Sequence, residues 1–217
     1  AQLPGCFGNG FGLVAVNDAL TAGKLLQTKV PVADDDMDVV VAAAAAIGAT
    51  SISVTTVSAI LADEYKDALL YVNDGAGEGQ AFRLGSHLAA GASATLVLNL
   101  AEDEVVKTAL TTSSLVGLKW PRWKDVIVFP VTVTGTPVGF TPCDIADNDY
   151  FWAQKKGDVA ALIDGTVVLG KGVIPSDAVA GAVEAQVDAG GDDPVVGWVQ
   201  NPIAVDTDYG HIYATIP

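Results

Sequence analysis

The stretch YVNDGAGEGQAFRLGSH, residues 71–87, decides the fold prediction, because its three alternate glycines suit two very different structures. A dinucleotide-binding fingerprint needs G-x-G-x-x-G between a strand and a helix, and a P-loop needs a GK[ST] that follows the glycines. Neither pattern is present. The glycines instead separate an apolar run from the alternating run QAFRLGSH, and Asp74-Gly75 supplies turn residues. We therefore predict a β-hairpin or β-corner rather than a phosphate site.

Short β-rich runs separated by turn residues extend from this stretch in both directions. Close spacing of such runs favours a sandwich or barrel over alternating β and α units. The predicted fold class is therefore mainly β, with β-sandwich or barrel domains of the jelly-roll-like or Greek-key type and few short helices. The runs are SISVTTV, ALLYVND, SATLVLNL, DVIVFPVTVTG, TVVLGKGVI, VVGWVQNPI and GHIYATI.

Four segments carry more specific expectations. LADEYKDAL (61–69) is predicted to form a single helical turn before the strand ALLYV, and AEDEVVKTAL (101–110) is predicted to form a short helix on a loop. The run Ala42–Ala46 fits a strand or a very short helix, since the adjacent Gly48 and β-branched residues oppose the helix preference of alanine. In ALIDGTVV, Asp164-Gly165 suits the positive φ angles of a type I′ turn, so a hairpin is predicted there.

The 217 residues suffice for one large β domain or two small ones. Residues 1–30 are rich in glycine with apolar side chains between, which indicates an extended N-terminal arm. The stretch TTSSLVGLKWPRWKD (111–125) interrupts the strand rhythm and is predicted to contain a domain boundary. We therefore expect a β-rich domain over residues 31–115 and a β-sandwich or barrel domain over residues 116–217.

The charge balance disfavours nucleic acid as a partner. Acidic residues outnumber basic ones 26 to 11, for a formal net charge of −15, and such a surface repels nucleic acid. No apolar run reaches the ~18 residues of a membrane span, and residues 1–16 lack the basic segment of a signal peptide. Cys6 and Cys143 are expected to be free thiols in a protein assembled in the cytoplasm, although a disulfide stays open.

No recognisable catalytic or metal-binding motif occurs. His87 and His211 are the only histidines, and neither belongs to a nucleophile–base pattern. The acidic runs at 34–38, 190–194 and 205–210 offer oxygen ligands for calcium but lack EF-hand spacing, so solvated turns are favoured. We therefore expect no enzyme activity, no cofactor and no metal, with calcium as a minor alternative.

Aromatic and cationic residues provide the candidate contacts with partners. Tyr150 and Trp152 are predicted to share one face of a strand, with Phe151 on the other, in a core or at a subunit contact. Aromatic side chains anchor interfaces by burying apolar area, and cations meet acidic groups of a neighbour. The candidate partner-binding residues are Phe7, Phe11, Trp120, Arg122, Trp123 and Lys124.

Three stretches resemble a group of structural proteins from tailed bacteriophages. They are YVNDGAGEGQAFRLGSH with GATSISV, NDYFWAQKKGDVAALIDGTVVLGKGVIPSDAVAGAVEAQV, and VVGWVQNPIAVDTDYGHIYATI. The resemblance covers roughly residues 40–217, rests on turn and strand chemistry, and leaves the first 30 residues out. It implies a virion component, most of all a capsid decoration (cement) protein on the outer capsid surface. Such proteins usually bind the major capsid protein as homotrimers, and the family has no catalytic residues to carry over.

The sequence therefore predicts a non-enzymatic protein that stabilises the capsid by bridging neighbouring major capsid proteins. The alternative is a tail or fibre component that binds a host receptor or glycan through an exposed Trp120–Trp123 patch. A carboxylate-based glycosidase is a third hypothesis, but no acidic pair stands out among the many carboxylates.

Overall fold

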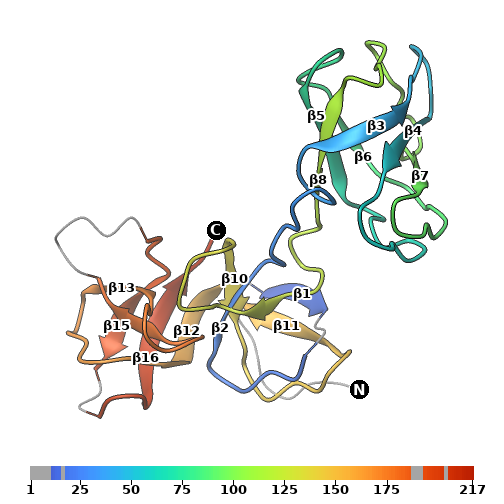
Figure 1. Cartoon of the computed structure of the whole chain (residues 1–217). Coiled ribbons are helices and arrows are strands. Elements are labelled where there is room, and N and C mark those ends of the chain that lie inside the picture. Colours follow the sequence, from blue (N-terminus) through green and yellow to red (C-terminus); the bar gives the residue numbers. More distant parts are fainter. Residues whose placement is uncertain (1–10, 16–17, 187–192, 203–204) are drawn as a thin grey trace. The chain divides into compact units, whose positions relative to one another are not determined.

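The chain is all β in the part that the structure describes. No helix occurs in this part, and its strands run from β1 to β16 in mainly antiparallel sheets (Figure 1). The mainly β prediction is therefore confirmed. This computed structural model describes residues 11–15, 18–186, 193–202 and 205–217, without the side chains of residues 11–15.

The chain forms two compact units, one of which is inserted in the sequence of the other. The inserted unit is Pro31–Pro121, and the framing unit combines Ala1–Val30 with Arg122–Pro217. The boundary thus falls inside the predicted stretch 111–125, but after residue 121 and not after the expected residue 115. The reason is that the strand beginning at residue 115 packs in the core of the inserted unit.

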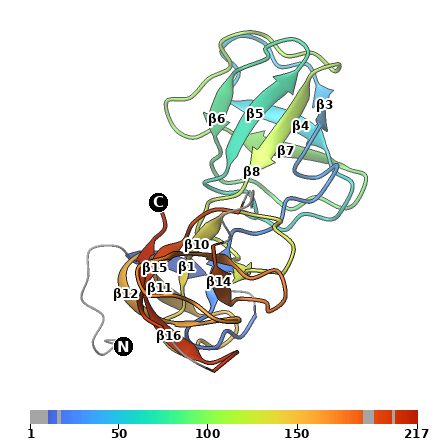
Figure 2. The same cartoon turned by 90° about the vertical axis from the view of Figure 1, so that its left-hand side faces the viewer.

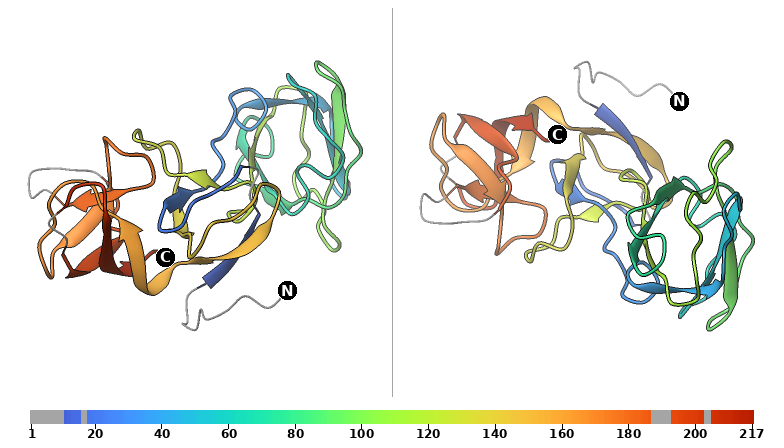
Figure 3. Two further views of the ribbon diagram at one scale, coloured as in Figure 1. Left: turned by 90° about the horizontal axis from the view of Figure 1, so that it is seen from below. Right: turned by 90° about the horizontal axis from the view of Figure 1, so that it is seen from above.

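Six strands build the inserted unit, in the sheet order β6-β5-β8-β3-β4-β7. The two edges of this sheet meet, because Gly85 N–H donates to Asn99 C=O and Ala101 N–H donates to Arg83 C=O, both at 2.8 Å. The sheet is therefore a closed barrel, and its strands form a ring in Figure 3. The strands are β3 (Val39–Ala43), β4 (Ser51–Thr55), β5 (Leu69–Asp74), β6 (Ala81–Arg83), β7 (Thr95–Asn99) and β8 (Leu115–Lys119).

The hairpin predicted from the glycine-rich stretch is present. Strands β5 and β6 pair antiparallel, with Leu69 opposite Arg83 and Tyr71 opposite Ala81 (Figure 2). Gly75 has φ +81°, and a Cβ there would lie 2.8 Å from a backbone carbonyl oxygen. Glycine is required at this position by both its backbone angle and the close approach of another loop.

The short helix predicted at 101–110 is absent, and segment 61–69 does not extend beyond turns. Segment 61–69 forms successive turns, and Asp63 and Asp67 have φ of +58° and +64°. Segment 101–110 also turns, with Asp103 at φ +70°. A residue in the left-handed region interrupts a right-handed helix, so neither segment can continue beyond a turn.

The alanine-rich run, for which strand and helix were both open, begins as a strand. Strand β3 extends to Ala43, and Ala45 then forms an isolated bridge with Leu110. The inward residues of β3, Val39 and Val41, are nearly fully buried in the barrel core.

The framing unit contains two five-stranded sheets, ordered β1-β11-β10-β2-β9 and β12-β16-β15-β13-β14. Only Lys155 separates β11 from β12, so one stretch of chain passes from the first sheet into the second. The first sheet has β1 (Phe11–Ala15), β2 (Leu25–Gln27), β9 (Ile127–Val128), β10 (Pro137–Phe140) and β11 (Tyr150–Gln154). The second sheet has β12 (Lys156–Leu162), β13 (Gly172–Pro175), β14 (Val183–Ala185), β15 (Gly197–Asn201) and β16 (Tyr209–Thr215).

The expected N-terminal arm differs from the structure in its described part. Strand β1 pairs with β11 along all five residues, and β2 lies between β10 and β9 inside the first sheet. Leu25 and Leu26 are both 0% exposed, because one packs in the core shared with the second sheet and the other in the core on the opposite face. A segment buried on both faces is an integral strand rather than a loose arm.

The hairpin predicted at Asp164-Gly165 is wrong. Strand β12 pairs with β16, and β13 pairs with β14 and β15, so the strands on either side of this turn do not pair with each other. Ile163 instead forms a parallel bridge with Val183, and Asp164 N–H donates to Val183 C=O at 2.9 Å. These contacts join β12 to β14 and curl the second sheet on itself.

Candidate partner-binding site

Trp120, one of the predicted contact residues, is a core residue of the inserted unit. Its side chain is 6% exposed, and its ring lies 4.9 Å from the ring of Tyr65, measured between centroids. The indole N–H donates to Asp36 Oδ1 at 2.9 Å. Trp120 therefore stabilises the barrel and is not exposed for a partner or a glycan, so the predicted Trp120–Trp123 patch does not form.

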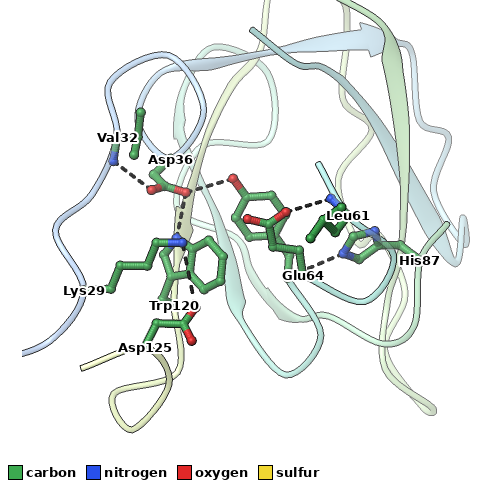
Figure 4. Close-up of polar contacts among 9 residues, drawn as sticks. Lys29, Val32, Asp36, Leu61, Glu64, His87, Trp120 and Asp125 are labelled. Carbon is green, nitrogen blue, oxygen red and sulfur yellow. Dashed lines mark hydrogen bonds and ion pairs between the residues drawn. The ribbon is translucent and has the colours of Figure 1, made fainter. Parts of the chain in front are cut away.

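The carboxylate of Asp36 is the centre of a buried polar network (Figure 4). Asp36 is 2% exposed, and it accepts hydrogen bonds from Trp120 Nε1 and Tyr65 Oη on Oδ1 and from Val32 N–H on Oδ2. Burial, and then the charge and hydrogen bond of Asp36, raise the pKa of Tyr65 well above its ordinary value. The network joins residues close to both ends of the inserted unit, Val32 and Trp120.

His87 also has a structural role here. Its Nε2 accepts a hydrogen bond from Tyr65 N–H at 2.8 Å, and its Nδ1 lies 2.9 Å from Leu88 C=O. A ring nitrogen that accepts carries no proton, so Nδ1 is the donor in this tautomer. Both nitrogens of this buried ring are thus used, and neither is available as a general base.

The acidic run 34–38 is a folded loop that uses its carboxylates internally. Asp35 accepts from the N–H groups of Val57 and Ser58. Burial acts to raise the pKa of Asp35, but hydrogen bonds from the side chain and backbone of Ser58 and from Val57 outweigh it and hold that pKa below its usual range. Among the described residues, no group of three or more His, Cys, Asp or Glu side chains is placed to hold a metal ion.

Two other predicted residues, Arg122 and Trp123, do come together, in the framing unit. The Arg122 guanidinium carbon lies 5.2 Å from the centre of the Trp123 ring, and Lys155 Nζ lies 5.1 Å from the same centre. Arg122 Nη2 donates to Pro137 C=O at 2.6 Å, which fixes the side chain against the start of β10. Two cations therefore share one half-buried aromatic ring.

Neither cation is neutralised within the described residues. No carboxylate oxygen lies within ion-pairing distance of Arg122 or Lys155, and the nearby Asp125 is paired with Lys29 at 4.0 Å. The Nε atom of Arg122 is buried and has no hydrogen-bond partner. Burial lowers the pKa of Arg122, and burial followed by the charge of Arg122 lowers the pKa of Lys155.

The remaining predicted contact residues are less informative. Lys124 is half-buried in the same segment as Trp123. The backbone of Phe11 lies in β1, opposite Gln154 of β11. Phe7 lies outside the described residues, as does Cys6, whereas Cys143 is exposed.

Exposed aromatic side chains occur on both sheets of the framing unit. Tyr150 and Trp152 are 73% and 49% exposed on β11, while Phe151 between them is 1% exposed, as the predicted strand alternation requires. On the second sheet, the 46% exposed Trp198 lies opposite Tyr213. These aromatics, rather than Trp120, are available to a partner.

A pocket of about 400 Å³ opens beside β6 in the inserted unit. Its lining contains no Ser, His or Cys side chain, so it carries no nucleophile–base pair. The lining residues are Gly79, Gln80, Ala81, Phe82, Asp103, Glu104, Val105 and Lys107.

No family model, curated protein or solved structure matches this chain. Within the described ranges, no helix has the length and apolar character needed to cross a membrane.

Sequence reasoning found two members of the cationic cluster and missed the third. Lys155 lies more than thirty residues from Arg122, and it reaches Trp123 only because β11 and β12 meet at that residue. Sequence reasoning also missed Asp36, because an acidic run is typical of a solvated turn. The available signal was the presence of Tyr65 and Trp120, whose O–H and N–H groups need acceptors when they are buried.

Proposed function

We propose that this chain is a non-enzymatic virion structural protein, a capsid decoration protein that stabilises a phage capsid by bridging neighbouring copies of the major capsid protein. It acts as a homotrimer on the outer capsid surface. The observation that carries the proposal is the distribution of exposed large apolar side chains over two separately cored units. Such a chain adheres at more than one point.

Each unit has the rigidity that a molecular clamp requires. The inserted unit is a closed barrel around one apolar core, and the framing unit packs two curled sheets around a shared core. Linking two binding bodies in one chain makes the second contact intramolecular, so modest individual contacts add up to tight attachment.

Both units also expose side chains suited to adhesion. In the framing unit, Tyr150 and Trp152 stand side by side on the outer face of β11. In the inserted unit, Ile47, Leu61 and Leu88 are 71%, 73% and 84% exposed. Burial of one such large side chain contributes about 2–3 kcal/mol, so a few of them are enough to anchor an interface.

The charge supports an exterior location. A net charge of −15 keeps the protein away from packaged nucleic acid and keeps particles apart in solution.

The test is addition of the purified chain to assembled shells that lack it. We expect saturable binding and a higher temperature of shell rupture. The double variant Tyr150→Ser, Trp152→Ser should bind at least tenfold more weakly because two anchors are lost, whereas Lys171→Gln, a change at an exposed lysine of the same unit, should bind as the natural chain does. If saturating protein neither binds shells nor changes their rupture, the proposal fails.

A second function is favoured by one observation. Trp198 and Tyr213 lie opposite each other on the outer face of the second sheet, where Asp158 is the next residue across from Tyr213. Exposed rings beside a carboxylate suit a sugar, which offers apolar faces and hydroxyl groups. A tail or fibre component would use this surface for a host glycan. Binding on a glycan array that Trp198→Ala abolishes and Trp123→Ala preserves would establish this function in place of capsid decoration.

A further inference from the structure

The cluster of Arg122, Trp123 and Lys155 has no acidic partner in the part of the chain that the structure describes. Two cations lie 5.2 Å and 5.1 Å from the centre of one indole ring, and no carboxylate of the described residues lies within ion-pairing distance of either. In a chain with 26 acidic and 11 basic residues, two neighbouring cations without an acidic partner among the described residues are unexpected. The nearby acid, Asp125, is already paired with Lys29.

The geometry holds this cluster ready for an anion. The bond from Arg122 Nη2 to Pro137 C=O fixes the guanidinium. Lys155 is fixed at its backbone, where its C=O accepts from Ile216 N–H at 3.0 Å. Mutual repulsion of two partly desolvated cations is relieved when a carboxylate binds between them. Burial lowers the pKa of Arg122, and burial followed by the charge of Arg122 lowers the pKa of Lys155.

We propose that Arg122 and Lys155, placed on the Trp123 ring, bind an exposed carboxylate from a second copy of this chain and so form a contact between subunits. The inference rests on the proposed function, which requires that copies associate. A second copy supplies acidic side chains in excess, and its surface is opposite in charge to the cluster. The site is completed only by the neighbouring copy.

The first test compares the self-association of two variants of equal net charge. Lys155→Gln and Lys171→Gln both change the formal charge from −15 to −16, so general repulsion between copies rises equally. We expect Lys155→Gln to weaken self-association about tenfold in sedimentation velocity, and Lys171→Gln to leave it nearly unchanged. Thermal unfolding of both variants checks that the fold is retained.

The second test identifies the partner group directly. A carbodiimide joins an amine to a carboxylate that is in contact with it, without a spacer. In a mixture of ¹⁴N- and ¹⁵N-labelled copies, mass spectrometry should find Lys155 joined to an Asp or Glu of the other isotope.

The results separate this inference from the proposed function. If the chain stays monomeric, if both lysine variants associate equally, or if Lys155 joins only to another protein in the assembled shell, the second-copy contact is wrong. If the chain still binds shells in any of these cases, the proposed capsid function is retained. If the natural chain does not bind shells, the proposed function itself is wrong.

Discussion

The buried carboxylate of Asp36 yields a prediction that the structure makes quantitative. In Asp36→Asn, the amide oxygen can still accept from Tyr65 and Trp120, but an NH₂ group replaces the oxygen that accepts from Val32 N–H at 2.8 Å. Two donors then face each other at a site that is 2% exposed. The inserted unit should therefore lose stability although its shape is unchanged.

The magnitude follows from the bonds that change. Loss of a hydrogen bond to a charged group costs about 1.5–3 kcal/mol, and the two remaining bonds weaken because their acceptor becomes neutral. Removal of a buried charge offsets part of this cost, by about 1 kcal/mol. The net loss should be about 2 kcal/mol, which lowers the urea midpoint of the inserted unit by roughly 1 M for an ordinary m-value.

The measurement must resolve one unit from the other. Trp120 is the one tryptophan in the sequence 31–121, so ¹⁹F NMR of chain labelled with 5-fluorotryptophan reports the inserted unit through a single resonance. Asp34→Asn is the matched control. It makes the same chemical change two residues away, at an exposed position with φ +64° that asparagine also adopts readily. Equal urea midpoints for the two variants would refute this account of Asp36.

Four further predictions test other parts of the structure. The pKa of Tyr65 is raised, so this phenol should ionise only as the protein unfolds, and stability should fall above about pH 10. In a titration followed by tyrosine absorbance, Tyr65→Phe should remove the phase that appears last as the pH rises. Gly75→Ala should destabilise more than Gly79→Ala in urea unfolding, since both glycines have positive φ but only the first is crowded by a backbone carbonyl. Burial and neighbouring aspartates raise the pKa of Glu184, so its ionised form disfavours folding. Glu184→Gln should therefore increase the free energy of unfolding at neutral pH by under about 0.5 kcal/mol and raise the thermal midpoint slightly. Below about pH 4 the substitution should not raise the midpoint. The excised segment 31–121 should unfold cooperatively by circular dichroism, because it closes its own barrel around its own core; a non-cooperative transition would contradict this.

The fold class was accessible from the sequence because strand alternation and turn chemistry are local. The glycine-rich stretch 71–87 gave the correct hairpin, and Tyr150 and Trp152 lie on the opposite face from Phe151 as expected. Pairing between strands is not local, and this is where the prediction at Asp164-Gly165 was wrong. A turn that suits a hairpin forms one only when the adjoining strands have no better partners, and here both pair elsewhere.

The candidate site was predicted only in part, because contacts between distant segments are not local either. Trp120 and Trp123 are three positions apart, yet the first packs in the inserted unit and the second belongs to the framing unit. No local pattern marks this division, because it depends on which core encloses each ring. Lys155 joins the cluster through the meeting of two strands, a contact that neither composition nor spacing reveals.

The acidic composition has a structural cause in addition to any role at an interface. In the described part of the chain, nine non-glycine residues have positive φ, and six of them are aspartates, which tolerate the left-handed region better than most residues. Many short strands need many tight turns, so part of the −15 charge is a consequence of the β architecture. Charge alone is therefore weak evidence for a partner. The stronger evidence is local. At the Arg122 and Lys155 pair, the described residues supply no carboxylate within ion-pairing distance, despite the excess of acid.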